Sequence, residues 1–244
     1  MAPLVHAAQA TGIATFTLDS PGNRNALSVD LVAELRAALA AAADPAVRAV
    51  VLTHSGNTFC AGADLKSPCD PADFVALLRE TAELPKPVVA RVTGHVRAGG
   101  LGLLGVCDIA AAGPQSTYAF TETHLGLAPA VISMPLLPRL DPRAAARYFL
   151  TAEVFDSAEA ARTGLLTLAA EDVDAALEPV LAGLRKASPQ GLAATKALTA
   201  AAVREALARD GSRLTELSAG LFASDEAREG ITARFERREP SWSL

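Results

Sequence analysis

Short apolar runs alternate with amphipathic stretches along the first part of the chain. Three runs rich in β-branched residues have the length of strands: Ile13 to Leu18, Ala49 to Thr53 and Val88 to Val92. Between them the pattern predicts two helices, one that begins after the N-cap residue Ser28 and ends before Asp44-Pro45, and one over Pro71 to Leu84. This order of strands and helices predicts a parallel α/β sheet with right-handed crossovers.

From about Pro142 onward the apolar residues recur at helical spacing. The predicted helices cover Pro142 to Leu150, Ser157 to Thr163, Val173 to Lys186, Gly191 to Ala208 and Asp225 to Arg237. No strong strand is expected after about Ala169. We therefore predict a core over residues 1–187 and a C-terminal helical region over residues 188–244, which packs on the core or on another subunit.

Composition narrows the class of protein. The 244 residues suffice for one large domain with a sizeable core. The net charge is −5 and the 22 basic residues are scattered, so they form no basic stripe for nucleic acid. The apolar runs are far shorter than the roughly 20 residues of a membrane span, and the first residues lack the order of a signal peptide. We expect a cytoplasmic protein that binds neither nucleic acid nor membranes.

The cysteines give no sign of a metal site or of a disulfide framework. Cys60, Cys69 and Cys107 form no C-x-x-C pair and have no metal-ligand spacing. We therefore expect reduced thiols and no bound metal. Cys60 has no obvious basic partner that would activate its sulfur, which argues against a nucleophilic role.

Two glycine-rich segments carry most of the chemical information. The first, Phe59 to Leu65, follows a strand, and its small residues allow a ligand to approach the backbone closely. The second, Arg97 to Gly105, leads from a strand into an apolar, helix-like stretch. A helix that begins in such a turn presents unpaired N–H groups and the positive end of its dipole, which suit an anion or a developing oxyanion.

The second segment also contains a nucleotide-like motif. Gly100 to Gly105 matches G-x-G-x-x-G, the dinucleotide fingerprint. About seven residues separate it from the strand Val88 to Val92, whereas the fingerprint follows its strand directly. Glycines that only permit close packing of a helix are a second interpretation. A nucleotide-binding oxidoreductase therefore stays open as an alternative class.

Further motifs occur along the chain in one particular order. They are Asn25-Ala26-Leu27-Ser28, Phe59-Cys60-Ala61-Gly62-Ala63-Asp64-Leu65, Pro85-Lys86-Pro87, Ala98-Gly99-Gly100, Cys107-Asp108-Ile109-Ala110 and Phe120-Thr121-Glu122-Thr123-His124-Leu125-Gly126-Leu127. With them the chain resembles the enoyl-CoA hydratase/isomerase (crotonase) family over nearly its whole length. The resemblance implies an α/β fold, a crotonase-like spiral of ββα units with two stacked sheets, plus a C-terminal helical oligomerisation region. It also implies an acyl-CoA thioester substrate, no cofactor besides the coenzyme A of that substrate, and a homotrimer or hexamer.

The resemblance implies the site residues as well. The backbone N–H groups of Ala63 and Gly99 are expected to hold the thioester oxygen, and Glu122 to act as general acid/base. The residues expected to bind the substrate or its CoA are Arg24, Ala26, Leu27, Ala61, Asp64, Leu65 and Gly100. Simpler roles stay open for two of these residues: Glu122 could be a solvated loop or capping residue, and Asp64 a helix-start cap.

The number of carboxylates bears on the reaction. Typical hydratases of the family carry two glutamates that hold the water, and the position of the first is Gly102 here. A single carboxylate suits the proton shuttle of the Δ3,Δ2-enoyl-CoA isomerases. Some bacterial hydratases resemble this pattern nevertheless, and Leu127 to Ser133 is similar to theirs. We predict an enoyl-CoA hydratase, with an isomerase and a non-catalytic acyl-CoA-binding protein as alternatives.

Other positions are candidates for contacts with the substrate. His95 and Arg97 flank the second loop, where they either contact a polar acyl group or CoA phosphates or are ordinary loop residues. The resemblance makes Lys196 and Phe235 candidates for the region of the CoA adenine. The acyl pocket is expected to draw on Phe74 to Leu84 and Val131 to Leu137.

Overall fold

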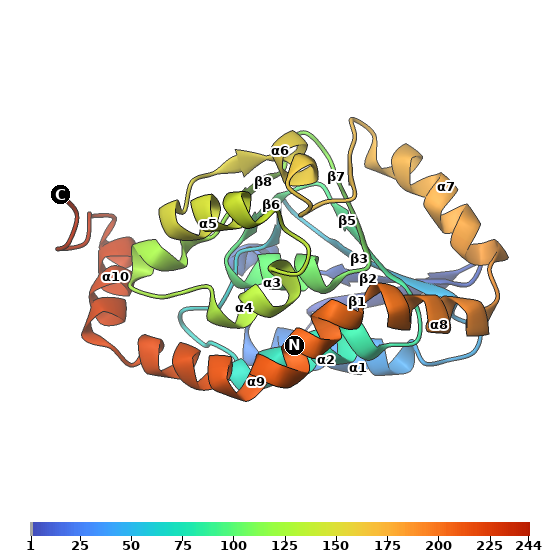
Figure 1. Cartoon of the computed structure of the whole chain (residues 1–244), viewed down its shortest axis with the longest axis horizontal. Helices are drawn as coiled ribbons and strands as arrows, with labels where there is room; N and C mark the ends of the chain where they lie inside the picture. Colours follow the sequence, from blue (N-terminus) through green and yellow to red (C-terminus); the bar gives the residue numbers. More distant parts are fainter. Residues whose placement is uncertain (1) are drawn as a thin grey trace.

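Two β-sheets form the centre of the molecule, and helices surround them (Figure 1). The computed structural model describes residues 2–244. The strands of the larger sheet, in spatial order, are β1 (Val5–Ala10), β2 (Ile13–Leu18), β3 (Ala49–His54), β5 (Val88–Val92), β7 (Ile109–Ala112) and β10 (Leu168–Ala169). Those of the smaller sheet are β4 (Thr58–Cys60), β6 (His95–Arg97), β8 (Thr117–Ala119) and β9 (Phe155–Asp156).

The chain passes repeatedly from the larger sheet to the smaller one. Strands β3, β5 and β7 are each followed by β4, β6 and β8 respectively, and within each sheet these strands run parallel. This order confirms the predicted α/β fold with a spiral of strand–strand–helix units and two sheets. The three-residue strands β4, β6 and β8 did not stand out in the sequence because they are too short to show a periodicity. Strand β1 pairs antiparallel with β2 and is largely exposed, so it has no apolar run.

The helices connect and cover the strands. In chain order they are η1 (Pro21–Asn23), α1 (Val29–Ala41), α2 (Pro71–Glu83), α3 (Gly99–Val106), η2 (Thr121–Leu125), α4 (Ala130–Leu136), α5 (Pro142–Thr151), α6 (Ser157–Arg162), α7 (Val173–Lys186), α8 (Pro189–Thr199), α9 (Ala201–Phe222) and α10 (Asp225–Glu236). Ser28 caps α1 as predicted, because its Oγ accepts a hydrogen bond from the N–H of Leu31 at 3.2 Å. Asp70 caps α2 in the same way, with Pro71 in the first turn.

The predicted single helix over Gly191 to Ala208 is wrong. Two helices, α8 and α9, meet at Ala200, in an alanine-rich stretch without any glycine or proline that would mark the break. Helix α9 then continues to Phe222, past Gly211. An added Cβ at Gly211 would lie 3.5 Å from Cγ1 of Val75 in α2. Packing against α2 therefore outweighs the low helix propensity of this glycine.

The C-terminal helices pack on the core of their own chain. Helix α9 lies along α4 and α2 and contributes Val203, Leu207 and Leu214 to the main core (Figure 1). Helix α7 covers the other face of the larger sheet with Val173 and Leu177. The division of the chain at residue 187 stays a prediction, since α9 shares the core of the preceding part.

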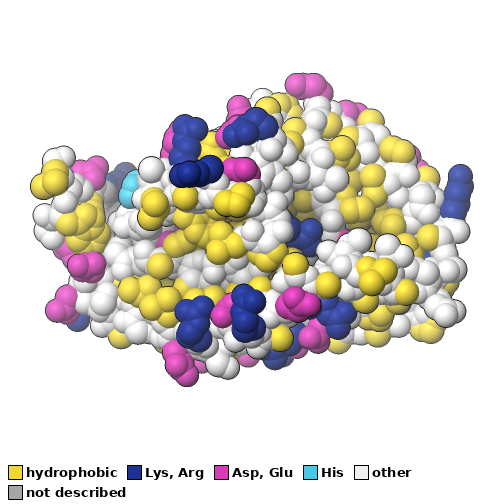
Figure 2. Space-filling view, in the orientation of Figure 1, with side chains coloured by type: hydrophobic (Ala, Val, Ile, Leu, Met, Phe, Trp, Pro, Cys, Tyr) yellow, Lys and Arg dark blue, Asp and Glu magenta, His cyan; other side chains and the backbone are white. Residues whose placement is uncertain are grey.

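The molecular surface combines apolar and charged areas. Figure 2 shows hydrophobic side chains gathered between α9 and the segment of α4 and α5, with charged side chains along α9. Large apolar side chains exposed in the second half of the chain include Leu137, Leu150, Leu198, Leu217 and Phe235. Among residues 2–244, no helix combines the length and the apolar character needed to cross a membrane.

Candidate active site

Three segments with predicted site residues lie at one edge of the smaller sheet. Strands β4, β6 and β8 are parallel neighbours, with Cys60 paired to Val96 and Arg97 paired to Ala119. The carboxyl ends of parallel strands meet at the same edge, where α/β proteins bind ligands. The two glycine-rich loops and the turn that contains Glu122 directly follow these three ends. The sheet therefore brings together residues that are about 60 positions apart in the sequence.

The two glycine-rich loops touch each other through their backbones. Gly62 has a φ of +91°, a conformation that side chains disfavour. A Cβ on Gly62 would lie 2.8 Å from Cβ of Ala98 and 3.2 Å from the nitrogen of Gly99. A Cβ on Gly99 would lie 3.7 Å from the nitrogen of Ala63. The nitrogens of Ala63 and Gly99 are therefore close neighbours, and the glycines make this approach possible.

Both of these backbone N–H groups are free to donate. Leu27 donates its N–H to Gly62 O at 2.8 Å and accepts from Asp64 N at 3.3 Å, a parallel bridge that turns the N–H of Ala63 away from Leu27. Gly99 is the first residue of α3, so its N–H has no acceptor within the helix. Within residues 2–244, neither N–H has a hydrogen-bond acceptor. Two adjacent free donors, one of them at a helix start, suit a developing oxyanion.

Glu122 has a buried carboxyl group in which one oxygen lacks a hydrogen-bond partner. Only 8% of the residue is exposed, so a solvated loop position is ruled out. Its Oε2 is buried and has no hydrogen-bond partner in the described part of the chain. Burial raises the pKa of Glu122 to about 7, and only its own backbone N–H opposes this shift. A carboxyl with such a pKa can take up and release protons near neutral pH.

The position of the absent first glutamate is closed by an apolar side chain. A Cβ on Gly102 in α3 would lie 2.5 Å from Cγ2 of Ile132 in α4. Both residues are buried, and this contact leaves no room for a longer side chain at position 102. The sequence pointed to Gly102 but not to Ile132, because the packing of α4 on α3 carries no local signal.

The predicted CoA-binding residues lie in the two glycine-rich segments or in the stretch from Arg24 to Leu27. Arg24 is exposed and its carbonyl accepts the N–H of Ala61 at 3.1 Å. Ala26 and Leu27 are buried. Ala61, Asp64 and Leu65 are partly exposed. Gly100 packs its backbone against Cys60. Direct contact of these residues with a ligand stays a prediction.

Asp64 stabilises a turn and does not cap a helix. Its carboxylate accepts hydrogen bonds from the N–H of Lys66 at 2.9 Å and from Nδ2 of Asn23 at 3.0 Å. These hydrogen bonds hold its pKa below the usual range, together with the charge of Lys66. The next helix, α2, begins only at Pro71, so the predicted helix-start cap is wrong.

Asn25 anchors the strand that leads into the first glycine-rich loop, a role that the sequence did not reveal. The residue is fully buried and has a φ of +53°. Its Nδ2 donates to Thr58 O at 2.7 Å, and its Oδ1 accepts the N–H of Ser20 at 2.7 Å. The motif Asn25-Ala26-Leu27-Ser28 therefore serves to fix β4 and the loop that follows it. A buried asparagine of this kind has no signature beyond the motif itself.

Two of the candidate contacts with CoA have structural partners instead. Arg97 donates from Nη1 to Thr117 O at 2.6 Å, and Nδ1 of His95 lies 2.9 Å from Oγ1 of the same threonine. His95 and Arg97 thus link β6 to β8. These contacts favour the interpretation of both residues as ordinary structural residues over a contact with CoA.

Lys196 is only 4% exposed and pairs with Oδ2 of Asp108 at 2.9 Å. In this chain Lys196 is therefore not a surface group for the CoA adenine, whereas Phe235 is exposed.

The remaining sulfur and glycine candidates are part of the packing. Burial raises the pKa of the Cys60 thiol to about 12, which disfavours the thiolate that a nucleophile needs. The nucleotide-like motif lies inside α3, where Gly100, Gly102 and Gly105 approach Cys60, Ile132 and Leu136. These glycines permit close helix packing and do not form a phosphate-binding loop.

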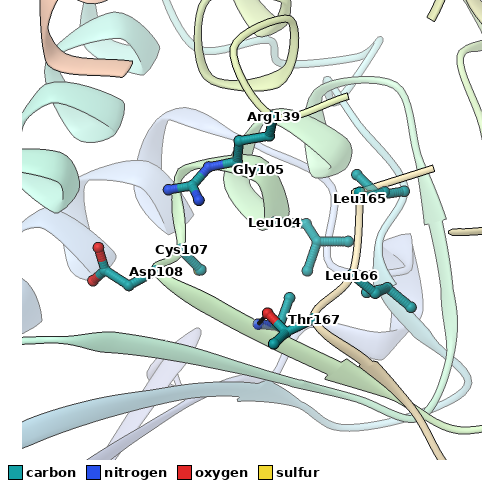
Figure 3. Close-up of a pocket in the computed structure, with 10 residues that line it drawn as sticks. Leu104, Gly105, Cys107, Asp108, Arg139, Leu165, Leu166 and Thr167 are labelled. Carbon is teal, nitrogen blue, oxygen red and sulfur yellow. Dashed lines mark hydrogen bonds between the residues drawn. The ribbon is translucent and has the colours of Figure 1, made fainter. Parts of the chain in front are cut away.

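A small cavity lies at the far end of α3 from Gly99. Its volume is about 50 Å³, and Figure 3 shows Leu104, Asp108 and Arg139 around it. Neither Glu122 nor the two N–H donors line it. The cavity is therefore distinct from the site formed by the three loops.

The fold and this site define a class of α/β proteins in which two free backbone donors and one buried carboxyl group follow the same edge of a parallel sheet. The sequence model of the enoyl-CoA hydratase/isomerase family matches residues 8–244. The chain belongs to this family, as the resemblance of its motifs indicated.

Individual proteins that are similar to this chain have names from the same family. The crystal structure of an enoyl-CoA hydratase from Mycobacterium avium is 53% identical, covers 100% of both chains and has a TM-score of 0.92. The crystal structure of an enoyl-CoA hydratase/isomerase from Pseudoalteromonas atlantica T6c is 27% identical, with a TM-score of 0.89 over 98% of this chain and 100% of that one. The crotonyl-CoA hydratase of Syntrophomonas wolfei is 32% identical over 94% of each chain. The chain is thus similar over its length to enzymes named for enoyl-CoA chemistry.

Proposed function

We propose that the protein is an enoyl-CoA hydratase that adds water across the 2,3 double bond of an enoyl-CoA thioester. The single observation that carries the proposal is the buried carboxyl of Glu122, whose Oε2 has no hydrogen-bond partner in the described part of the chain, on a turn at the same sheet edge as two free N–H donors. The names of the relatives support the same reaction. Coenzyme A enters as part of the substrate, and the absence of any other cofactor stays a prediction.

The proposed steps follow from the charges that develop. The N–H groups of Ala63 and Gly99 hold the thioester oxygen, which becomes negative when water adds at C3. Losing one such donor costs about 3–4 kcal/mol of transition-state stabilisation. The carboxylate of Glu122 accepts a proton from the water, whose hydroxyl forms the bond to C3. The carboxyl then gives a proton to C2, so the carboxylate is restored.

A second candidate is supported by the contact between Gly102 and Ile132. With an apolar side chain where the first glutamate would lie, a single carboxyl suits a Δ3,Δ2-enoyl-CoA isomerase. Glu122 would then take a proton from C2 of a 3-enoyl-CoA and return it at C4, while the same two N–H groups hold the enolate oxygen. No water is consumed in this reaction.

Two assays on the purified protein separate the candidates. One offers a trans-2-enoyl-CoA and follows the loss of its conjugated absorbance, and the other offers a trans-3-enoyl-CoA and follows the gain of that absorbance. Hydration with little isomerisation is the expected result. Isomerisation alone would replace the hydratase by the isomerase. Retained CoA-ligand binding without either turnover would indicate a non-catalytic acyl-CoA-binding protein and contradict the proposal.

Assembly and location are proposals that stand beside the reaction. A homotrimer or hexamer is supported by the family and by large exposed apolar side chains such as Leu150 and Leu198, at 75% and 79% exposure. Sedimentation of the full chain tests the assembly. A cytoplasmic location stays a prediction from the sequence.

A further inference from the structure

The C-terminal helix α10 lies against the turn that carries Glu122. Figure 1 shows α10 beside this light green turn, at the end of the molecule near the C-terminus. The two elements are about 100 residues apart in the sequence, yet α10 and η2 are in contact. The face of α10 turned to the protein contains the buried small residues Ala227, Gly230 and Ala233.

At two glycines the backbones of α10 and η2 contact each other directly. A Cβ on Gly230 of α10 would lie 2.6 Å from the carbonyl carbon and 2.7 Å from the Cα of Leu125 in η2. A Cβ on Gly126, which ends η2 with a φ of +69°, would lie 2.6 Å from the carbonyl carbon of Glu226. A backbone atom cannot rotate away as a side chain can, so even one methyl group here must displace the turn or the helix.

A displacement of Leu125 also moves Glu122, because backbone hydrogen bonds connect the residues of this turn. The N–H of Leu127 donates to Glu122 O at 3.0 Å, and the cap at Gly126 donates to the same carbonyl. Upstream, Ala119 is fixed to the second glycine-rich loop, because its carbonyl accepts the N–H of Ala98 at 3.1 Å. The carboxyl of Glu122 makes no hydrogen bond of its own through Oε2, so it depends on this backbone for its position.

We propose that α10 is a positioning element for proton transfer, in which the backbone contact between Gly230 and Leu125 holds the Glu122 carboxyl in place. The inference rests on the proposed function of Glu122 and gives the C-terminal helix a role in the site of its own chain. Gly230 is a positioning residue, since it acts only through the turn. An error of about 1 Å in such a position costs on the order of a hundredfold in rate.

The test compares Gly230→Ala with Gly220→Ala in the full-length protein. Gly220 lies in α9 with nothing within 4 Å of an added Cβ, so it is a matched helix substitution without a contact. We expect Gly230→Ala to lower kcat by at least about tenfold relative to Gly220→Ala, with little change in KM. A carbon-13 titration of the Glu122 carboxyl, which needs no turnover, is expected to show its pKa displaced from the wild-type value.

The outcomes separate this inference from the proposed function. Equal kcat and equal Glu122 titration in the two variants would overturn the positioning role, whatever the wild-type protein catalyses. If the wild-type protein turns over no enoyl-CoA, the proposed function fails, and the titration alone decides on positioning. If Gly230→Ala does not fold, Ala227→Gly, which removes a methyl from the same buried face, takes its place. Its Glu122 pKa is expected to shift as well, and an unchanged pKa would overturn the inference.

Discussion

Ile132 of α4 fills the space that a side chain on Gly102 of α3 would need. A Cβ on Gly102 would lie 2.5 Å from Cγ2 of Ile132 and 3.0 Å from its Cβ. The glycine at the position of the family's first glutamate is therefore matched by an apolar residue from the next helix. A carboxylate cannot be restored there by one substitution alone.

This contact predicts a paired effect on stability and on the reaction. Gly102→Glu alone is expected to lower the free energy of unfolding by at least roughly 1–3 kcal/mol, because it overpacks the core and buries a charge. Adding Ile132→Ala is expected to recover part of the loss and to raise hydration relative to isomerisation. Urea unfolding and the two enoyl-CoA assays measure these effects, with Ile132→Ala as the control. A double variant no more stable than Gly102→Glu would contradict the packing argument.

Glu122 predicts a pH dependence of both rate and stability. Burial raises its pKa to about 7, so the carboxylate form needed as a base appears as the pH rises through about 7. Hydration at low substrate concentration is expected to rise over the same range. Glu122→Gln is expected to lower turnover by roughly 10²–10⁴-fold and to keep CoA-ligand binding. Wild-type rates in this variant would exclude Glu122 as the acid/base.

The same pKa makes the folded protein less stable at high pH. The folded state holds a proton on Glu122 that the unfolded chain releases near pH 4.5, so stability is full below that pH and falls as the pH rises to about 7. The difference between the two pKa values corresponds to about 3 kcal/mol at most. Between pH 4 and pH 8, wild type is therefore expected to lose more stability than Glu122→Gln. Parallel pH profiles of the unfolding free energy would show that the carboxyl is solvated.

The close packing around Gly99 predicts that one added methyl group lowers the activity. A Cβ at this position would lie 2.9 Å from Cδ1 of Leu27 and 3.7 Å from the nitrogen of Ala63. Gly99→Ala is expected to separate the two N–H donors and to lower kcat by roughly 10²–10³-fold, the effect of one lost oxyanion donor. Steady-state kinetics measure this loss, with Gly183→Ala as the control, since nothing lies within 4 Å of an added Cβ there. Equal kcat in both variants would argue against this pair of donors.

The ion pair of Lys196 with Asp108 predicts a structural role for the lysine. Its Nζ also donates to Thr81 O at 2.8 Å and to Lys86 O at 3.0 Å, so α8 is anchored to the core. Lys196→Met leaves the largely buried carboxylate of Asp108 without its cation and is expected to cost about 3–5 kcal/mol of unfolding free energy. Denaturant unfolding measures this cost. Arg209→Met, at an exposed ion pair, is the control and is expected to leave the midpoint unchanged.

Local patterns in the sequence determined much of the fold. The strands over Ile13 to Leu18 and Val88 to Val92 and the helix Val173 to Lys186 agree with the structure residue for residue. Long runs with a clear period and with capping residues are local signals, and the structure contains the elements that they predict. The order of the short motifs likewise indicated the family and pointed to Glu122, Ala63 and Gly99.

Contacts between distant segments decided the rest. The break at Ala200 has no residue that marks it, and from there on α9 packs on α2 and α4. The burial of Lys196, the closure of position 102 by Ile132 and the contact of α10 with the Glu122 turn join segments far apart in the chain. The sequence by itself determined which residue types are present and those local elements that have a clear hydrophobic period. Tertiary structure alone decided the pKa of Glu122 and the absence of space beside Gly102, because desolvation and steric contact depend on which atoms surround a group.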